Sequence, residues 1–317
     1  MDNNHIVIDA HELGKRFGDQ VAVQGVSFQV PRGNIFGFIG PSGSGKTTTI
    51  RLLLGVYKPT EGKALVLGDE AGHFTKETRA RIGYMPQLSV LYRDLSVWEN
   101  LNFAASIYGM SPLRGKRLQE LLHFVELSEH QHKLVRNLSG GMQRRLSLAS
   151  TLVHDPELLY LDEPTAGVDP VLRRKFWDHF EALKKQGHTL FVTTQYVSEA
   201  AYCDLVGVLA NGRLSTVDTP HGLRHQAFGG DLVEIRAATD IAYDHLLFLG
   251  RQPFVRANVE RLDNRRVRLV VDEAATAIPA LLDRCREQGL EIESIEEYLP
   301  PFDDVFVELV KTEPANG

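Results

Sequence analysis

Hydrophobic and polar positions alternate through the first part of the chain in short runs, which glycine-containing turns separate. The runs are HIVIDAHEL, VAVQGVSFQV, GNIFGFIG and KALVLG, and a helical pattern from Lys46 to Leu54 lies between the last two. Short runs with a period of about two and many β-branched or aromatic residues are typical of strands. We therefore expect a β-rich N-terminal region that contains one early helix.

The pattern changes twice further along the chain. Between about residues 88 and 137 apolar residues recur three and four positions apart, as in VWENLNFAASIYG and RLQELLHFVELSEH, which indicates an all-helical insert. From Leu138 to about Leu214, buried-type strands (ELLYLDEP, TLFVTTQ) alternate with a helix (PVLRRKFWDHFEALKKQG). Such alternation predicts a parallel sheet wrapped by helices. Residues 1–220 are thus expected to form one α/β domain with a helical insert.

The remaining residues predict a second, smaller domain. Residues 221–230 are expected to be a linker with some helical content. Beyond them, DLVEIRA, DIAYDHLLFLG, a segment around Phe254 to Leu262, RVRLVVD, AATAIPALLDRCREQG and LEIESIEEY follow the order β-α-β-β-α-β. This order is that of a split βαβ unit, so residues 231–317 are expected to form an α+β, ferredoxin-like domain.

Composition narrows the possible functions. The chain has 317 residues, of which 43% are hydrophobic and 24% charged, as in ordinary soluble proteins. Its net charge of −6 disfavours a broad nucleic-acid surface. Cys203 and Cys285 lie far apart, which suggests neither zinc nor a disulfide framework. We also expect neither a membrane-spanning helix nor a signal peptide, because no long apolar run occurs.

A glycine-rich segment, FGFIGPSGSGKTTTI, follows an apolar strand and opens a helix. Residues 40–47 fit the phosphate-loop pattern G-x-x-x-x-G-K-[ST], in which backbone N–H groups and a helix N-terminus surround phosphate oxygens. Lys46 can reach the β- and γ-phosphates, and the Thr47 hydroxyl can ligate Mg²⁺. The expected nucleotide contacts of this loop are Gly40, Pro41, Ser42, Gly43, Ser44, Gly45, Lys46, Thr47 and Thr48.

Two adjacent carboxylates end the apolar run LLYL in the segment ELLYLDEPTAGVD. Asp162 is the expected Mg²⁺ partner, acting through a water. Glu163 would then face the attacking water as its general base or orienting group. The alternative is an acidic pair at a helix N-terminus before Pro164.

The segment from Asn137 to Pro170 decides the subclass. Its LSGGMQ string, together with GPSGSGKTT, GYMPQ and LLYLDEPTAGVD, resembles the ATP-binding cassette (ABC) ATPases over residues 5–220. The resemblance implies that Ser139, Gly140 and Gly141 bind the γ-phosphate of ATP held by a second protomer. Two ATP sites would therefore form in a head-to-tail dimer.

Further residues carry roles that the resemblance implies. Phe17 looks like the aromatic residue that stacks on adenine, although it could instead be a core residue at a hairpin. Gln87 matches the glutamine that touches Mg²⁺ or the lytic water, and Asp169 lies in the GVD loop that crosses the dimer interface. Gln195 stands where the family usually has a switch histidine. An amide cannot relay a proton, so Gln195 is expected to sense the γ-phosphate beside the catalytic Lys46 and Glu163.

The C-terminal domain and its PPFDDVF string resemble the ATPase subunits of type-2 exporters of the daunorubicin-resistance type, with Phe302 where leucine is frequent. This implies separate permease subunits, and a peripheral, cytoplasmic position on the inner face of the membrane. Trp98, Leu101 and Phe103 either line a permease groove or form the core of the insert. An importer ATPase and an ABC ATPase without a transport role remain as alternatives.

Overall fold

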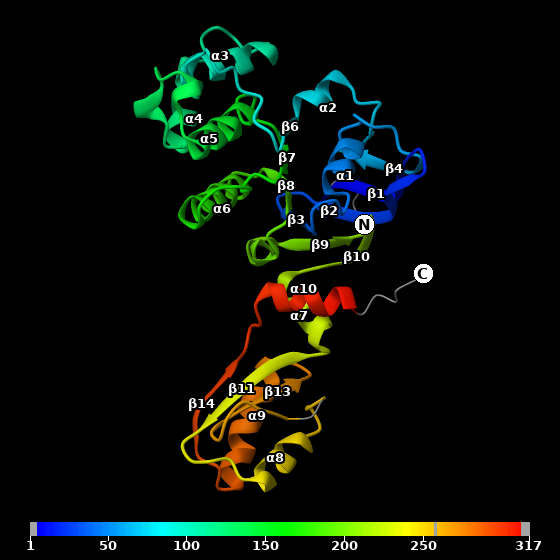
Figure 1. The fold of residues 1–317 in the computed structure, drawn as a ribbon, viewed down its shortest axis with the longest axis vertical. Coiled ribbons are helices and arrows are strands. Elements are labelled where there is room, and N and C mark those ends of the chain that lie inside the picture. Colours follow the sequence, from blue (N-terminus) through cyan, green and yellow to red (C-terminus); the bar gives the residue numbers. More distant parts are fainter. Residues whose placement is uncertain (1–4, 257–258, 312–317) are drawn as a thin grey trace. The chain divides into compact units, whose positions relative to one another are not determined.

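The computed structural model describes residues 5–256 and 259–311, and its chain divides into two compact units (Figure 1). The first unit is Met1–Val217 and the second is Asp218–Gly317. Within the described ranges, no helix is both long enough and apolar enough to cross a bilayer.

A six-stranded sheet forms the centre of the first unit, in the order β10-β9-β3-β8-β7-β6. The strands that carry the site are β3 (Ile35–Ile39), β7 (Leu158–Asp162) and β8 (Thr189–Thr194), and all their residues are buried. The others are β6 (Ile82–Met85), β9 (Leu205–Ala210) and β10 (Arg213–Asp218). Strands β6, β7, β8, β3 and β9 pair in parallel, which explains their continuous apolar runs. The predicted parallel sheet is confirmed.

A second sheet, β2-β1-β4-β5, contains the N-terminal strands. It consists of β1 (Ile6–Phe17), β2 (Gln20–Pro31), β4 (Glu61–Val66) and β5 (Asp69–Glu70), all paired antiparallel. Phe28 of β2 stacks on Phe36 of β3 with ring centroids 5.3 Å apart, and Phe36 stacks on Phe191 of β8 at the same distance. These rings join both sheets in one core, on which helix α1 (Lys46–Leu53) also packs.

Helices α3 (Val97–Ile107) and α4 (Gly115–Phe124), with 3₁₀ turns at Ser128–His130 and Val135–Asn137, form the predicted helical insert. Ser96 and Glu99 make a reciprocal capping box that starts α3. Helices α5 (Gly140–Thr151) and α6 (Pro170–Lys185) follow, and a short α2 (Lys76–Ala80) precedes β6. A 3₁₀ segment, Val197–Tyr202, connects β8 to β9.

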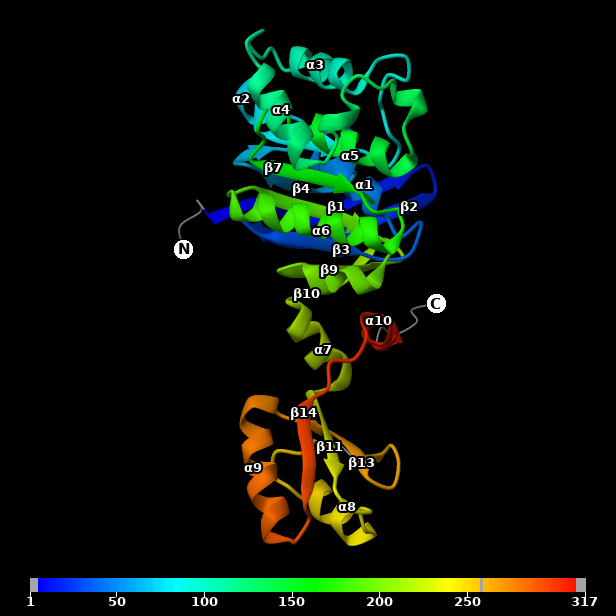
Figure 2. The same ribbon diagram turned by 90° about the vertical axis from the view of Figure 1, so that its left-hand side faces the viewer.

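The second unit contains the expected β-α-β-β-α-β order. Its elements are β11 (Asp231–Ala237), α8 (Tyr243–Gly250), β12 (Glu260–Arg261), β13 (Arg266–Val271), α9 (Ala274–Glu287) and β14 (Ile292–Glu297). The antiparallel sheet order is β12-β13-β11-β14, and Leu249 of α8 and Leu281 of α9 share one core with its strands (Figure 2). The fold class is thus as predicted. Strand β12 is short, and residues 257–258 of its expected segment lie outside the described residues.

Two further helices belong to this unit. Helix α7 (Pro220–Phe228) occupies most of the segment that was expected to be a linker, and α10 (Phe302–Lys311) forms where no element was predicted. Phe302, Val305 and Leu309 are the buried positions of α10. The guanidinium of Arg224 lies 4.1 Å from the centre of the Phe302 ring, so α7 and α10 pack on each other.

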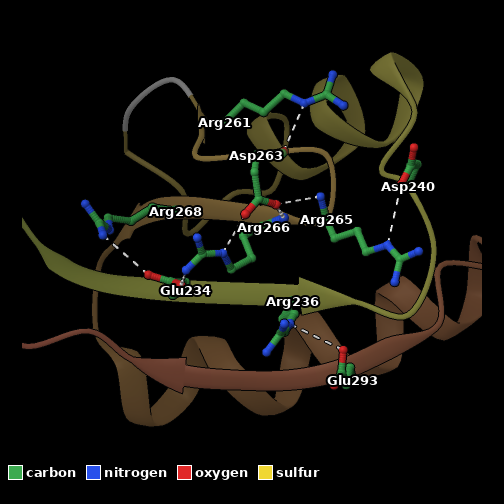
Figure 3. A network of polar contacts seen from close by, with 9 residues as sticks. All are labelled: Glu234, Arg236, Asp240, Arg261, Asp263, Arg265, Arg266, Arg268 and Glu293. Atoms are coloured by element: carbon green, nitrogen blue, oxygen red, sulfur yellow. Dashed lines mark hydrogen bonds and ion pairs between the residues drawn. The ribbon is translucent and has the colours of Figure 1, made fainter.

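The sheet face away from α8 and α9 carries paired charges (Figure 3). Glu234 of β11 lies 3.3 Å from Arg268 and 3.6 Å from Arg266, both of β13. Arg266 also donates to Asp263 at 2.7 Å. This hydrogen bond, together with those from the backbone N–H groups of Arg265 and Arg266, lowers the pKa of Asp263 to about 2. Arg266 and Arg268 are thus each paired with neighbouring carboxylates rather than left as open cations.

Both cysteines are buried, one in each unit. A Cβ on Gly37 of β3 would come within 2.5 Å of the Cys203 sulfur, so the thiol packs directly on the strand backbone. Burial raises the pKa of Cys285 to about 11 and that of Cys203 further still. Both side chains therefore stay as neutral thiols near neutral pH.

Candidate functional site

The phosphate loop connects β3 to α1. Gly43 and Gly45 have φ angles of 80° and 107°, which side chains other than glycine rarely adopt. A Cβ on Gly40 would lie 2.1 Å from the Leu209 carbonyl oxygen, so only glycine fits there. The loop therefore closes tightly against the sheet and ends at the N-terminus of α1, where backbone N–H groups favour an anion.

A cavity of about 690 Å³ opens above this loop. Its size lies within the range of about 300–1,000 Å³ that is usual for ligand sites. The lining residues are Phe17, Gln20, Val21, Ala22, Ser42, Gly43, Gly45, Lys46, Thr47, Thr48, Gln87, Glu163, Asn211 and Gly212. Phe17 and the phosphate loop thus line the same cavity.

Lys46 is buried at the bottom of the site. Its ammonium group donates to the carbonyl oxygens of Gly40 (2.8 Å) and Pro41 (3.0 Å) and lies 3.4 Å from Glu163 Oε1. Burial lowers the pKa of Lys46, although the charge of Glu163 opposes that shift. A triphosphate bound here would meet a positive charge already held in place.

Asp162, the last residue of β7, is 1% exposed. Its Oδ1 accepts hydrogen bonds from the hydroxyls of Thr47 (3.1 Å) and Thr193 (2.7 Å). Within the described residues, Oδ2 has no hydrogen-bond partner, and burial raises the pKa of this carboxyl. An unpartnered buried carboxylate oxygen beside the Thr47 hydroxyl fits a hard divalent cation such as Mg²⁺.

Glu163 follows directly and lines the cavity. Its φ angle of 47° is uncommon for a residue with a side chain. The backbone N–H donates to Thr193 Oγ1 at 3.0 Å, and Oε2 of the side chain accepts from the Gln87 amide at 2.9 Å. The structure therefore places Glu163 between Lys46 and Gln87, with its carboxylate facing the cavity.

Gln195 lies just past the end of β8, as the sequence indicated. Its Oε1 accepts a hydrogen bond of 2.9 Å from the hydroxyl of Ser42 in the phosphate loop. The side chain therefore reaches the loop from the neighbouring strand. Ser44 of the same loop is buried, and its hydroxyl has no hydrogen-bond partner among the described residues.

Phe17 lies at the outer end of the cavity, with 43% of its surface exposed. Its ring meets the ring of Tyr57 edge-on, with centroids 5.3 Å apart. This exposure is not that of a core residue at a hairpin, the alternative that the sequence left open. The exposed ring is available to stack on a planar ligand.

The signature and GVD residues lie at the N-termini of two other helices. Ser139 caps α5 by accepting from the Met142 N–H at 3.3 Å, and Asp169 caps α6 by accepting from the Leu172 N–H at 3.0 Å. Gly140 is exposed, and a Cβ on Gly141 would come within 2.4 Å of Leu172. Among the described residues that line the cavity, none of these four predicted site residues is found.

Two residues of the site, Thr193 and Arg144, have positioning roles that the sequence motifs do not indicate. Thr193 fixes both Asp162 and the backbone of Glu163. Arg144 of α5 is 8% exposed and donates to the carbonyl oxygens of Pro86 and Glu163. Helical spacing could have indicated Arg144, because the buried residues Ser147, Leu148 and Thr151 continue its face of α5.

A second, more apolar hollow of about 300 Å³ lies between the helical insert and the β6 and α5 elements. Phe103 and Tyr92 meet edge-on in its lining, with ring centroids 4.6 Å apart. Leu101 is fully buried and Trp98 partly buried, so Leu101 belongs to the core of the insert and Phe103 to the hollow. Leu101 therefore fits the core interpretation, and a permease groove at Phe103 stays a prediction.

The phosphate loop, the carboxylate pair at the end of β7 and the parallel sheet that carries them define a P-loop nucleoside triphosphatase. Comparison with known proteins identifies the family. Residues 23–166 match the family described as ABC transporter, and residues 219–310 match the C-terminal domain of ATP-binding proteins of the DrrA1-3 type. The chain belongs to the ATP-binding proteins of ABC transporters, whose general activity is ATP hydrolysis.

Two similar proteins have names that state a transport function. A Nod factor export ATP-binding protein I of Burkholderia lata is 40% identical over 72% of this chain and 76% of its own length. The probable multidrug ABC transporter ATP-binding protein YbhF of Escherichia coli is 42% identical over 70% of this chain. The chain spans only 38% of the length of YbhF.

Solved structures agree with this assignment. The ATP-binding subunit of an ABC transporter matches 70% of this chain and 93% of its own, with a TM-score of 0.64 and 28% identity. An ATP-binding cassette of an ABC transporter in its ADP conformation matches 68% of this chain and 91% of its own, with a TM-score of 0.61 and 26% identity.

Proposed function

We propose that this chain is the ATP-hydrolysing subunit of an exporter and that ATP-driven dimer closure moves separate permease subunits. The observation that carries the proposal is the position of Glu163, whose carboxylate faces the cavity between Lys46 and Gln87. The C-terminal match to DrrA-type proteins, and relatives named for multidrug transport and Nod factor export, support export.

The chemistry proposed is in-line attack of water on the γ-phosphate. Thr47, Gln87 and Asp162 would hold Mg²⁺, which supplies positive charge against the phosphate oxygens. Lys46 binds the β- and γ-phosphates, while Gln195 contacts the γ-phosphate from the end of β8. Glu163 accepts the proton of the attacking water, because an amide at position 195 cannot do so. Phe17 stacks on the adenine at the outer end of the cavity.

A second protomer completes each site in this proposal. Ser139, Gly140 and Gly141 are exposed or partly exposed at the start of α5, on a different element from the cavity of the same chain. Asp169 is likewise exposed at the start of α6. In a head-to-tail homodimer, or with a paired ATPase subunit, the α5 terminus of one protomer would approach the γ-phosphate bound by the other.

The permease is proposed to dock on the apolar hollow of the insert. Val90, Tyr92, Phe103 and Ile107 line it and are exposed, which suits a short amphipathic helix of a partner. The chain would then lie peripherally on the inner face of the cell membrane. Its ATPase domain covers roughly residues 1–220, and the accessory domain follows with α7 packed on it.

The catalytic part of the proposal is tested by Glu163→Gln. Glutamine keeps the size of the side chain but cannot accept a proton, so we expect ATP turnover to fall by about 10²- to 10⁴-fold. Binding of ATP should persist, because Lys46 and the phosphate loop are untouched. Turnover is measured by phosphate release, and dimer formation with ATP by size-exclusion chromatography.

Glu129→Gln, a surface change on the insert, serves as the matched control and should leave turnover unchanged. Near-normal turnover in the Glu163 variant would refute its role as the base. The transport part is tested by recovering the tagged Glu163→Gln chain from detergent-solubilised membranes with ATP present. Recovery without any membrane-spanning partner would contradict the exporter assignment.

A further inference from the structure

Arg144 is an unusual residue for the buried side of a helix. It lies in the second turn of α5 and is 8% exposed. Its Nη2 donates to the carbonyl oxygen of Glu163 at 2.7 Å, and its Nη1 donates to the carbonyl oxygen of Pro86 at 3.2 Å. One side chain therefore joins α5 to the segments that follow β7 and β6.

The contact with Glu163 falls on a strained part of the backbone. A φ angle of 47° costs free energy for any residue with a side chain, so neighbouring contacts must maintain it. Thr193 accepts the Glu163 N–H through both its carbonyl and its hydroxyl oxygen, at 3.1 and 3.0 Å. Arg144 holds the carbonyl oxygen of the same residue. The two contacts fix both peptide groups of Glu163 and thereby the direction of its side chain.

The contact with Pro86 acts on the other member of the catalytic pair. Gln87 is the next residue, and its amide donates to Glu163 Oε2 at 2.9 Å. Arg144 therefore binds the backbone beside both partners of the Gln87–Glu163 hydrogen bond.

The positive charge of Arg144 lies near the carboxylates of Asp162 and Glu163. Burial lowers the pKa of its guanidinium, and the charges of Asp162 and Glu163 oppose that shift. An arginine remains protonated in proteins, so two buried carboxylates face two buried cations, Arg144 and Lys46. Its planar fork can donate to two separate carbonyl oxygens at once, which a single ammonium group does with less fixed geometry.

We propose that Arg144 is a positioning residue for ATP hydrolysis: it couples the place of helix α5 to the orientation of Glu163 and Gln87 in the same protomer. The inference rests on the proposed function. Arg144 contacts backbone carbonyl groups, and its effect on the reaction passes through Glu163. Because α5 begins with Ser139–Gly141, a shift of this helix on dimer closure would reach the chain's own base directly.

Arg145 provides a matched control on the same helix. Its Nη1 donates to the carbonyl oxygens of Val125 (3.0 Å) and Glu126 (3.2 Å) in the insert, away from the carboxylate pair. Arg144→Gln and Arg145→Gln therefore remove the same charge from adjacent positions. Only the first change releases the backbone of Glu163.

The experiment measures steady-state ATP hydrolysis by the full-length chain over a range of ATP concentrations, which gives kcat and KM separately. For Arg144→Gln we expect kcat to fall by about 10- to 100-fold, as when outer hydrogen-bond partners of reactive groups are removed, with KM nearly constant. Arg144→Lys should recover part of the loss, and Arg145→Gln should match the wild type. Arg144→Gln added to Glu163→Gln should cause less than about a twofold further loss, because both act on one group.

Equal kcat values for Arg144→Gln and Arg145→Gln would overturn the inference. So would a loss in Arg144→Gln that is multiplied in full by Glu163→Gln, since Arg144 would then act by another route. If Arg144→Gln does not fold, Arg144→Lys decides in the same way, since its kcat must lie below that of Arg145→Lys. A wild-type chain without any ATP hydrolysis would instead refute the proposed function, and the inference with it.

Discussion

Phe17 offers a direct test of how the cavity binds its ligand. The ring is 43% exposed at the cavity edge, meets Tyr57 edge-on and has the Lys15 ammonium 5.1 Å from its centre, so the exposed part of the ring is available to a base. Stacking of one base on an aromatic ring contributes about 1–3 kcal/mol. Loss of the ring in Phe17→Ala should therefore weaken ATP binding by about 5- to 150-fold.

The measurement compares two ligands on one protein. Calorimetry in the Glu163→Gln background, where ATP is not consumed, gives the Kd of ATP and of inorganic tripolyphosphate. Tripolyphosphate has no base, so its Kd should change by less than about twofold, within ordinary non-additivity. Phe17→Tyr keeps the ring and should retain the ATP affinity. An equal loss for both ligands, or unchanged ATP binding in Phe17→Ala, would refute the stacking role.

Two further predictions concern the carboxyl end of the sheet. Gln195→Ala should slow hydrolysis, whereas Gln195→His should be tolerated and should add a pH dependence near the histidine pKa of about 6.5; full kcat in the alanine variant would show that the residue is structural. Burial raises the pKa of Asp162 in the folded, ligand-free chain, so ionisation of this carboxyl opposes folding. The folded state therefore loses stability as pH rises from about 3.9, the unfolded pKa, through the folded pKa. Asp162→Asn should therefore raise Tm at neutral pH without ligand and abolish the further rise with Mg²⁺ and ATP; a lower Tm without ligand would contradict this.

The sequence predicts local geometry well where that geometry depends on residues adjacent along the chain. The phosphate loop needs Gly43 and Gly45 for its positive φ angles, so its residue types directly indicate its shape. The role of Arg144 depends instead on which face of α5 meets the sheet and on carbonyl groups far away in the chain. Both partners are backbone carbonyl groups, those of Pro86 and Glu163, so no residue type in the sequence indicates these contacts. The signature motif around Ser139 also ends before the turn of α5 that contains Arg144.

The contrast between local sequence pattern and tertiary contacts also explains where the second unit differs from the predicted elements. The apolar residues Phe302, Val305 and Leu309 have helical spacing, but the resemblance of PPFDDVF to a family motif carries no secondary-structure signal, so α10 is absent from the predicted elements. Strand β12 spans only Glu260–Arg261, which is too short to give a period. Its pairing with β13 comes from tertiary structure rather than from local preference.

The burial of both thiols makes this chain well suited to spectroscopy. Cys203 and Cys285 are the chain's only cysteines, and both are buried and held as neutral thiols, so maleimide reagents should leave them largely unmodified in the folded state. A cysteine introduced at an exposed position outside the site, such as Glu129 on the insert, would accept a spin label or fluorophore selectively, with no need to replace the natural ones. Distances between labels on the two protomers of the proposed dimer could then be followed through the ATP cycle in an otherwise unaltered chain.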